Sequence, residues 1–443
     1  MTGQETAAGA DTQGLAWFTG AGLGIFIHWD HIAQQEVEIS WPIVGRSIGR
    51  DADGSPRYMS VEQYHSTASS FDPQQWDATQ VAALIASAGA RYAVLTARHH
   101  DGYCMYPSAV SDFGVAATAL GRDIVGEFVE ATRAAGLRVG LYYSLPDCHH
   151  SDYPAFTDAD RPYRRERWPR EDWDDYDPGV ERLRRSSPEA WSRYLDYVRE
   201  QLTELLTSYG TIDLLWFDGE WERSPEEWDT DGLHALIRSL QPDIVINDRL
   251  LGHGDYQTPE QGLPAELSDT PWELCLTIGE QWAYRSDEPR VKSARSLVAQ
   301  LSEVVSRGGN LLLNISPDAN GVVPDWQRER LEAIGDWLAR HGAAVLTAGP
   351  APQIRHYGPV TAGESTIYLH LVYLPVEELV VRGVPVDRVS SVRLMMTGEP
   401  LAYRTGGDAY EVAGVERLGD LTIAAPAPSG SLIDVIAVEL EPR

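Results

Sequence analysis

Residues 188–219, PEAWSRYLDYVREQLTELLTSYGTIDLLWFDG, decide the fold of this chain. The long first part has the period of a helix, and it leads straight into IDLLWF, an apolar run that stops at Asp218. A strand that is apolar at every position is buried on both faces, which is typical of parallel sheets covered by helices on both sides. The stretch therefore predicts one helix–strand unit of an α/β protein.

The same unit recurs along the chain. Five further runs rich in β-branched residues are predicted strands: GLGIFIHW at 22–29, YAVLTARHH at 92–100, RVGLYYSL at 138–145, IVINDR at 244–249 and NLLLNIS at 310–316. Between them lie helices with recognisable ends, such as the one that Asp77 can cap and the one that stops at Gly136. This alternation predicts a (β/α)8-like barrel of the TIM type rather than an open Rossmann sheet, and the barrel could be irregular because only six strands are clear.

The pattern changes after a last helix at 324–342, PDWQRERLEAIGDWLARHG. From Gly349 onward the chain shows only short strands between Gly and Pro turns: TIYLHLVYL at 366–374, EELVVRGVPV at 377–386, VSSVRLMM at 389–396, DLTIAAP at 420–426 and LIDVIAVEL at 432–440. We therefore expect two domains, a barrel over residues 1–348 and a C-terminal antiparallel β-sandwich over residues 349–443.

Composition narrows the classes of function. There are 36 basic residues against 66 acidic ones, a formal net charge of −30, so nucleic acid and anionic membrane surfaces would be repelled. The three cysteines are widely spaced and form no CxxC pair, which argues against a disulfide framework or a structural zinc site. The N-terminal stretch lacks a basic region followed by an apolar run, and no window has the apolar length of a membrane span, so we expect a cytoplasmic protein.

Polar side chains follow five of the predicted strands in succession. They are His28 after the first strand, His99, His100 and Asp101 after the second, Tyr142, Tyr143 and Ser144 at the third, Trp216 and Asp218 at the fourth, and Asn247, Asp248 and Arg249 at the fifth. The carboxyl ends of barrel strands carry the active site, so we expect these side chains to face one pocket. Caps and turns also need polar residues, but five polar strand ends in a row are more than turns explain.

Asp218 is the most informative of these residues. It comes two residues after Trp216 at the end of a buried strand, and the adjacent Gly219 would let a ligand or another backbone approach closely. One interpretation is structural, with the carboxylate accepting N–H groups from the following turn. The other is a catalytic carboxylate that nearby histidines and Arg249 keep charged.

In these motifs the chain resembles the α-L-fucosidases of glycoside hydrolase family 29. GIFIHW is similar to the first-strand signature of that family, LTARHHDGYCMYPS to its HHDGF segment, and GLRVGLYYS, LLWFDGEW and VINDR match further segments in order. YQTPEQ and WELCLTIGEQWAY resemble its acid/base region and the stretch beyond, and SRGGNLLLNISPDANGVVPDWQRERLEAIGDWL resembles its final barrel segment. The resemblance implies a (β/α)8-like catalytic domain followed by a β-sandwich, as the strand pattern predicts independently.

The resemblance also implies roles for individual residues. Asp218 aligns with the nucleophile, and Glu260 in YQTPEQ is our choice for the general acid/base, with Glu273 in WEL as the second candidate because this position varies among family members. The implied substrate-binding residues are His28, Glu38, Trp41, His99, His100, Tyr142, Trp216 and Arg249, with Tyr142 preferred over Tyr143. The expected protein is a retaining, exo-acting hydrolase of terminal α-L-fucosyl residues in fucosylated glycans or fucosides, with no cofactor and no metal.

Alternatives stay open at this point. The same machinery could act on a related sugar such as an α-L-galactoside. A metal-dependent barrel hydrolase could use His28, His99, His100 and Asp101, although adjacent residues on a strand point to opposite faces.

Two further features of the sequence have no assigned role. Asp30 follows His-Trp where the family usually has Gly, and a side chain there could narrow or recharge the floor of the pocket. The densely charged segment 158–185 is either a solvated excursion or part of a substrate rim. Formation of a homo-oligomer also stays open.

Overall fold

Seven parallel strands form the first sheet of the computed structural model, in the order β5-β4-β3-β2-β1-β7-β6. They are β1 (Leu23–Ile27), β2 (Tyr92–Arg98), β3 (Arg138–Ser144), β4 (Leu214–Asp218), β5 (Val245–Ile246), β6 (Glu273–Thr277) and β7 (Asn310–Ile315). Apart from Arg138, their residues are buried, as the apolar runs predict. The structure describes residues 13–118, 121–153, 186–266, 269–406 and 418–442, so the charged segment 158–185 lies outside the described residues.

Helices alternate with these strands, and the helix that Asp77 is predicted to cap begins at Ala78. The longer ones are α3 (Ala78–Ser87), α4 (Ile124–Ala134), α5 (Pro188–Ser208), α7 (Thr230–Leu240), α8 (Ala294–Ser306) and α9 (Asp325–His341), and the shorter ones are α1 (Gln13–Phe18), α2 (Val61–His65), α6 (Pro225–Trp228) and α10 (Ala343–Leu346). Short 3-10 helices are η1 (His31–Gln34), η2 (Ala68–Ser70), η3 (Val115–Ala117), η5 (Glu220–Glu222) and η6 (Val386–Arg388). The side chains of Asp77, Asp123 and Ser187 each accept the backbone N–H three residues on, an N-cap worth about 1 kcal/mol.

The two edges of the parallel sheet are linked through residues 256–260. Isolated parallel bridges pair Asn247, just beyond β5, with Tyr256, then Gln257 with Trp272, and finally Glu260 with Cys275 in β6. The prediction of a parallel α/β sheet is confirmed, and β6 is the strand that the sequence analysis did not count. Its five residues, ELCLT, begin with a glutamate, so no distinct apolar run marks it as a strand.

The interior of this curled sheet is filled with aromatic rings. Phe18, Phe26, Tyr92, Tyr142, Trp216 and Tyr256 belong to one buried cluster. The carboxylate of Glu273 lies among them and accepts hydrogen bonds from the hydroxyl of Tyr92 and, at 3.0 Å, from the indole nitrogen of Trp216. Gly24 makes room for this packing, since a Cβ atom there would lie 2.2 Å from the ring of Tyr92. Buried side chains therefore fill the interior of the sheet, and we call the cluster around Gly24, Tyr92 and Glu273 the floor.

The C-terminal part consists of antiparallel strands, as predicted. A five-stranded sheet has the order β12-β15-β10-β9-β8, and a three-stranded sheet has the order β11-β14-β13. The strands are β8 (Gly349–Pro350), β9 (Val360–Ala362), β10 (Thr366–Leu371), β11 (Glu378–Pro385), β12 (Val389–Leu394), β13 (Tyr403–Gly406), β14 (Leu418–Ala424) and β15 (Asp434–Leu440). Both sheets contribute to one apolar cluster, with Leu369, Leu379 and Leu421 among its buried members.

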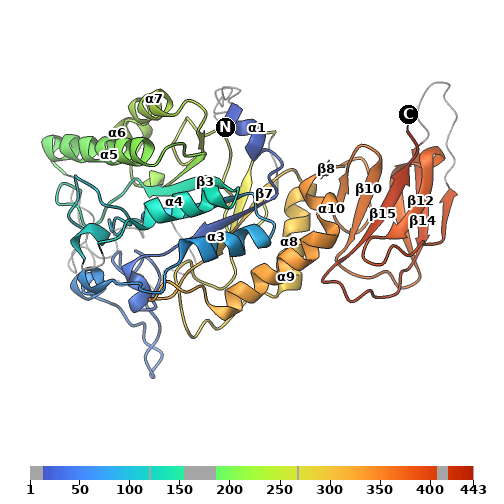
Figure 1. The fold of residues 1–443 in the computed structure, drawn as a ribbon, viewed down its shortest axis with the longest axis horizontal. Helices are drawn as coiled ribbons and strands as arrows, with labels where there is room; N and C mark the ends of the chain where they lie inside the picture. Colours follow the sequence, from blue (N-terminus) through green and yellow to red (C-terminus); the bar gives the residue numbers. More distant parts are fainter. Residues whose placement is uncertain (1–12, 119–120, 154–185, 267–268, 407–417, 443) are drawn as a thin grey trace.

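Figure 1 shows the two parts at opposite ends of an elongated molecule, with α8, α9 and α10 between them. Trp337 of α9 donates its indole N–H to the carbonyl of Ile433 at 2.8 Å. Arg295 of α8 reaches the carbonyls of Val372 and Leu432. Specific hydrogen bonds therefore fasten the antiparallel strands to the helices of the first part.

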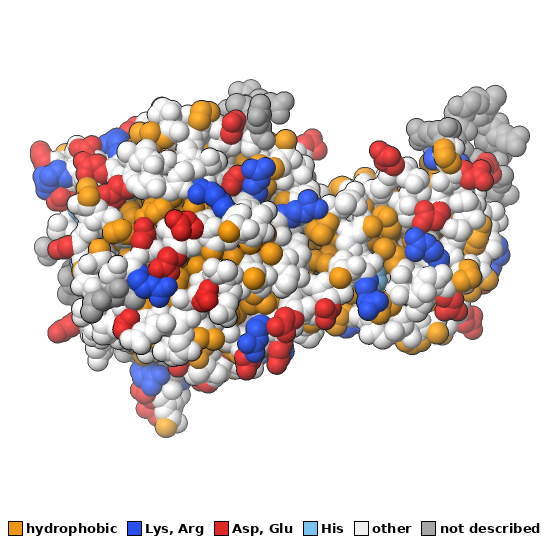
Figure 2. Space-filling view, viewed as in Figure 1, with side chains coloured by type: hydrophobic (Ala, Val, Ile, Leu, Met, Phe, Trp, Pro, Cys, Tyr) orange, Lys and Arg blue, Asp and Glu red, His pale blue; other side chains and the backbone are white. Residues whose placement is uncertain are grey.

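The surface carries charge of both signs. On the face seen in Figure 2, acidic and basic side chains are interspersed rather than gathered into one patch. All three cysteines are free and buried, in line with the sequence. None of the described helices is long and apolar enough to cross a membrane.

Gly24→Ala should lower the free energy of unfolding by about 1–3 kcal/mol, because the added methyl group overlaps the ring of Tyr92 in a filled interior. Urea denaturation followed by tryptophan fluorescence measures the change. Gly363→Ala is the matched control, since its Cβ atom would meet no described atom within 4 Å. That variant should stay within about 0.5 kcal/mol of the parent. If Gly24→Ala lowered the free energy of unfolding by as little as the control does, the close contact between Gly24 and the ring of Tyr92 would be contradicted.

Candidate active site

Asp218 ends β4 and is surrounded by hydrogen-bond donors. Its Oδ2 accepts the hydroxyl of Tyr142 at 2.8 Å and lies 3.4 Å from Nε2 of His100. Its Oδ1 is 2.5 Å from Nη1 of Arg249. The hydroxyl of Tyr142 and the guanidinium of Arg249 donate to this carboxylate, and the imidazole of His100 lies beside it. Groups from three different strand ends therefore converge on Asp218, which the structural interpretation of a turn-forming aspartate does not explain.

The backbone closes tightly over this strand end. Gly219 has a φ of 80°, and a Cβ atom there would stand 2.2 Å from Cδ of Pro146. The N–H of Leu145 donates to the carbonyl of Asp218 at 2.9 Å. Gly219 thus lets the segment after β3 approach, which agrees with the close backbone approach inferred from the sequence.

One guanidinium holds two carboxylates. Arg249, just beyond β5, contacts Asp218 through Nη1 and Glu260 through Nη2, the latter at 3.1 Å, and its Nε donates to the hydroxyl of Thr258 at 3.2 Å. The cation lies 4.5 Å from the centre of the Trp216 ring, which supports it from one side. The side chain of Arg249 is 11% exposed and that of Glu260 is 42% exposed, so Glu260 stands nearer to solvent.

Asp218 stays ionised despite its burial. Burial raises the pKa of its carboxyl group, but Arg249 and the imidazole of His100 outweigh that effect and hold the pKa of Asp218 well below its usual range. A carboxylate in this state is available as a nucleophile or as a stabiliser of positive charge.

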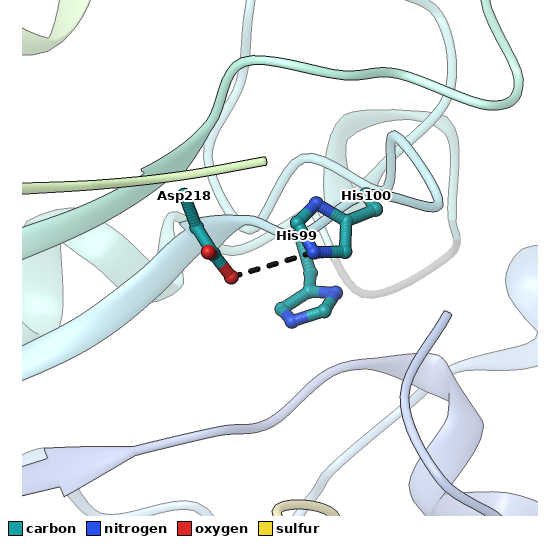
Figure 3. Close-up of side chains that lie close together, drawn as sticks. All are labelled: His99, His100 and Asp218. Carbon is teal, nitrogen blue, oxygen red and sulfur yellow. Dashed lines mark ion pairs between the residues drawn. The ribbon is translucent and has the colours of Figure 1, made fainter. Parts of the chain in front are cut away.

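Figure 3 shows the imidazoles of His99 and His100 beside the carboxylate of Asp218, with His100 directed at it. The two ring centroids are 4.3 Å apart, so the expectation that these adjacent side chains point to opposite faces is wrong. The reason is that β2 ends at Arg98, and both histidines belong to the turn beyond the strand. The ring of His99 also stacks on Tyr142, with centroids 5.1 Å apart.

A neighbouring amide fixes the tautomer of His28. The side-chain nitrogen of Asn314 donates to the carbonyl of Trp282, so its oxygen faces Nδ1 of His28 at 2.7 Å and accepts from it. Burial lowers the pKa of His28 to about 4, so the ring is neutral. We therefore assign Nε2 of His28 as a hydrogen-bond acceptor.

His99 has the opposite tautomer. The hydroxyl of Ser40 accepts the N–H of Asp101 at 2.9 Å, so its own hydrogen is directed at Nδ1 of His99, 2.6 Å away. Burial holds the pKa of His99 well below its usual range, so Nε2 carries the remaining hydrogen and is a donor. Ser40 reaches this position with a φ of 61°, a strained backbone for a residue with a side chain.

Tyr142, rather than Tyr143, has its side chain in the site. Successive residues of a strand point to opposite faces, and Tyr142 is the one that reaches Asp218. Tyr143 instead donates to the side-chain oxygen of Gln201 at 3.0 Å and lies against the guanidinium of Arg98, 4.3 Å from its ring centre.

The two candidate acids lie in different surroundings. Glu273 is fully enclosed at the start of β6, bound to Tyr92 and Trp216, and burial raises its pKa to about 7. Glu260 is on the linking segment 256–260, partly exposed and beside Arg249. Proton transfer to a departing sugar oxygen needs a carboxyl group that the substrate can reach, which favours Glu260.

Glu38 holds a loop of the site. Its buried carboxylate accepts three backbone N–H groups at 3.0 to 3.1 Å, two of them from residues 282–283. Trp282 on that loop places its ring 4.8 Å from the ring of His28. Trp41, further along the same chain segment as Glu38, stands 6.1 Å from the ring of His100.

Trp282, Ser40 and Asn314 are residues of the site that were not predicted from the sequence. Trp282 had a signal, since it stands in the GEQWAY motif that carries part of the family resemblance. Ser40 and Asn314 had none, because each acts on a histidine that is 59 or 286 residues away in the chain.

The residue set suggested for a metal-dependent hydrolase is not assembled. Asp101 turns its carboxylate to the hydroxyl of Tyr64, at 2.8 Å, and to Asp30. His99, His100 and Asp218 do lie within ligand distance of one another. The guanidinium in contact with Asp218 already supplies that carboxylate with a cation.

Asp30 lies apart from the pocket residues. Its carboxylate accepts the N–H of Ile32 at 2.7 Å, as the cap of η1, and otherwise interacts with Asp101. The expectation that this side chain narrows or recharges the pocket floor is therefore wrong, because its carboxylate caps η1 and faces Asp101.

Comparisons with known proteins agree with this arrangement. The sequence profile of the family Alpha-L-fucosidase matches residues 4–343. Human tissue alpha-L-fucosidase is 31% identical over 360 residues, covering 76% of this chain and 70% of that protein. Alpha-L-fucosidase isoenzyme 1 from Paenibacillus thiaminolyticus superposes with a TM-score of 0.80 at 32% identity, with 97% of this chain and 99% of that one covered. An α-L-fucosidase from Bacteroides thetaiotaomicron, solved as a trapped covalent intermediate with 2-fluoro-fucosyl fluoride, gives a TM-score of 0.77 at 25% identity, with 100% of both chains covered.

Arg249→Met should destabilise the protein most at neutral pH. The native pKa of Asp218 lies below its unfolded value, so ionised Asp218 contributes stability above roughly pH 4, and this contribution is lost as the pH falls further. Without the guanidinium, burial raises the pKa of Asp218 and the loss is about 3–5 kcal/mol at pH 7. Toward pH 4 the variant takes up a proton on Asp218, so the difference in free energy of unfolding between the variant and the parent should shrink.

Urea denaturation at both pH values measures these differences. Arg393→Met is the control, since it breaks a partly exposed ion pair with Glu439, 3.0 Å long, on the C-terminal sheet. Its loss should stay below about 1 kcal/mol at either pH. If Arg249→Met lowered the free energy of unfolding by the same amount at both pH values, the dependence of this loss on ionised Asp218 would be ruled out.

Proposed function

The chain belongs to the α-L-fucosidase family, glycoside hydrolase family 29, and from this premise we propose which residues carry out its reaction. It is a retaining, exo-acting α-L-fucosidase that releases terminal α-L-fucosyl residues through a covalent glycosyl-enzyme. We assign Asp218 as the nucleophile and Glu260 as the general acid/base. The observation that supports this assignment most strongly is the guanidinium of Arg249, which contacts both carboxylates.

The reaction has two halves, each with one carboxylate acting on the sugar. In the first, an oxygen of Asp218 attacks the anomeric carbon, the bond to the aglycone oxygen breaks, and Glu260 gives its proton to that oxygen. In the second, Glu260 takes a proton from water, the water oxygen bonds to the anomeric carbon, and Asp218 leaves as a carboxylate. Two inversions return the original configuration.

Arg249 serves both halves. Before attack it helps to keep Asp218 ionised within a buried site. Once Asp218 is an ester it carries no charge, and Glu260 becomes the anionic partner of the guanidinium. The same cation then lies beside the base that activates water.

The pocket suits a neutral deoxysugar with hydroxyls on one side and a methyl group on the other. His28 offers an acceptor and His99 a donor, so two sugar hydroxyls can be bound with opposite polarity. Trp41 and Trp282 supply aromatic surface beside these polar groups, suited to the C–H face of a sugar. Fucosylated glycans or fucosides are the substrate class, and the related-sugar and metal-dependent alternatives are not favoured.

We also propose the finer architecture. Residues 256–260 complete an irregular (β/α)8-like barrel through the bridges on either side of them, and the two antiparallel sheets form a sandwich around their shared apolar cluster. The division into residues 1–348 and 349–443 is supported by the change to antiparallel strands at β8. A homo-oligomer and a cytoplasmic location stay predictions.

Incubation with 2-fluoro-fucosyl fluoride should label one peptide, the one that contains Asp218, because the fluorine slows release of the ester after the first half-reaction. Peptide mapping by mass spectrometry locates the label. Asp218→Ala should take up no label and lose about 10⁴-fold or more in turnover of an aryl α-L-fucoside. A label on any other carboxylate would overturn the assignment of the nucleophile.

Glu260→Ala should lose about 10²–10⁴-fold in kcat/KM on fucosides with poor leaving groups and much less in kcat/KM on activated aryl fucosides, since only the former need the acid. Its kcat on aryl fucosides should still fall, because hydrolysis of the glycosyl-enzyme needs Glu260 as base. Added azide should restore turnover and yield a fucosyl azide, because the anion attacks the glycosyl-enzyme without needing a base. Glu273→Gln is the comparison variant and should not respond to azide. The opposite pattern in these two variants would move the acid/base role to Glu273.

A further inference from the structure

A second cluster of ligand-type side chains lies beside the active site and takes no part in the reaction described above. Asp30 and His31 follow β1, and Asp101 follows β2. All three side chains are buried, and one ligand atom from each lies within 4.8 Å of the others. Nε2 of His31 is 3.9 Å from Oδ2 of Asp101, too long for a hydrogen bond.

One of these atoms has no hydrogen-bond partner at all in the part of the chain that the structure describes. Oδ2 of Asp30 meets no N–H or hydroxyl donor, although its carboxyl group lies within hydrogen-bonding range of Asp101, and Nε2 of His31 forms no hydrogen bond with any described residue. The residues are only 2% and 0% exposed, so water outside the protein does not satisfy them either. Buried polar atoms in native proteins are nearly always paired, so an unmet lone pair that faces two carboxylates indicates a bound group.

The remaining atoms of each side chain hold it in place. Nδ1 of His31 donates to the hydroxyl of Thr67 at 2.9 Å, whose hydrogen goes to the carbonyl of His31, and Nε2 is left with its lone pair. Oδ1 of Asp30 accepts the N–H of Ile32. This is the pattern of metal ligands, in which outer hydrogen bonds fix the direction of each donor atom.

Asp101 is held in the same way. Its Oδ1 accepts the N–H of Tyr103 at 3.1 Å and its Oδ2 accepts the hydroxyl of Tyr64 at 2.8 Å. Among the described residues, no lysine or arginine forms an ion pair with Asp30 or Asp101. Arg98, three residues before Asp101, pairs with Asp147 instead. Two carboxylates enclosed together need a cation or a proton to offset their charge.

We propose that Asp30, His31 and Asp101 bind one divalent transition-metal ion, zinc foremost, as a structural site. An imidazole nitrogen with two carboxylate oxygens is a donor set that Zn²⁺ accepts, whereas Ca²⁺ and Mg²⁺ require oxygen ligands alone. The ion balances both carboxylates and satisfies the lone pair of His31. It lies outside the machinery of Asp218 and Glu260, so it takes no part in the chemical steps.

Such an ion would fasten two loops of the active site to each other. Asp30 and His31 belong to the loop after β1, and Asp101 follows directly on His99 and His100. The backbone N–H of Asp101 also donates to the hydroxyl of Ser40, which sets the tautomer of His99. The site therefore fixes the turn that presents the histidines to the sugar.

The competing explanation is a proton shared between the two carboxylates. Burial and the neighbouring Asp101 raise the pKa of Asp30 well above its usual range, and a protonated Asp30 would donate to Asp101. That arrangement leaves Nε2 of His31 without a partner, whereas a metal ion satisfies it. Metal content and its effect on unfolding separate the two.

The full chain, produced in medium with added zinc and purified without chelator, should carry about one equivalent of transition metal by plasma mass spectrometry. Asp30→Asn keeps the cap to Ile32 but removes a ligand charge, and its metal content should fall below about 0.2 equivalents. His31→Gln is a second ligand variant with the same expected loss. His65→Gln, a neighbouring histidine whose ring centre is 6.5 Å from that of His31, is the matched control and should keep its metal.

Thermal unfolding gives an independent readout. Protein unfolded with a chelator and refolded should gain about 5 °C in Tm when Zn²⁺ is added, because the ion binds only the folded state. The two ligand variants should show no such gain, and His65→Gln should show it in full. The shared proton would be established instead if the parent protein carried no metal and its Tm did not change with Zn²⁺ or Mn²⁺. The same conclusion would follow if the Asp30→Asn protein bound as much metal as the parent.

Discussion

An ionised carboxylate buried at the end of β4 has to be offset by a cation, and Arg249 provides it. Much of the surrounding structure serves this pairing. The strand β5, which precedes Arg249, has only two residues and ends at Ile246. The guanidinium of Arg249 lies over the ring of Trp216. The hydroxyl of Tyr142 and the imidazole of His100 occupy the other oxygen of Asp218. With water largely kept out by buried rings, these contacts act in a medium of low dielectric constant, where they are strong.

Hydrophobic period and strand ends predicted the parallel sheet and the convergence of His99, His100, Tyr142, Asp218 and Arg249, because the carboxyl ends of parallel strands meet on one side. The same pattern was wrong for Tyr143 and Asp101, whose side chains turn to other partners. Hydrophobic period alone does not mark Glu260, which lies on a segment without regular period between β5 and β6, and only the family resemblance pointed to it. The sequence also could not show that His99 and His100 lie together, since this depends on where β2 stops. Ser40 and Asn314 orient histidines through contacts between distant parts of the chain, and such contacts leave no local pattern.

The histidines show how the neighbours of a residue define its task. His28 and His99 are both neutral and buried, yet one presents an acceptor and the other a donor, because an amide oxygen faces the first and a hydroxyl hydrogen the second. The departure from the family at Asp30 acts at a similar remove. Its carboxylate accepts the N–H of Ile32 and lies beside His31 and Asp101, not among the groups that surround Asp218.

The floor formed around Gly24, Tyr92 and Glu273 has a consequence for the order of events in turnover. Because buried aromatic rings fill the interior beneath Asp218, neither the aglycone nor water is given a route on that side. The aglycone and the attacking water therefore use the same side of the anomeric carbon in turn, as the two half-reactions require. A sugar hydroxyl that takes the place of water there becomes the acceptor, and the product is then a new glycoside instead of free fucose.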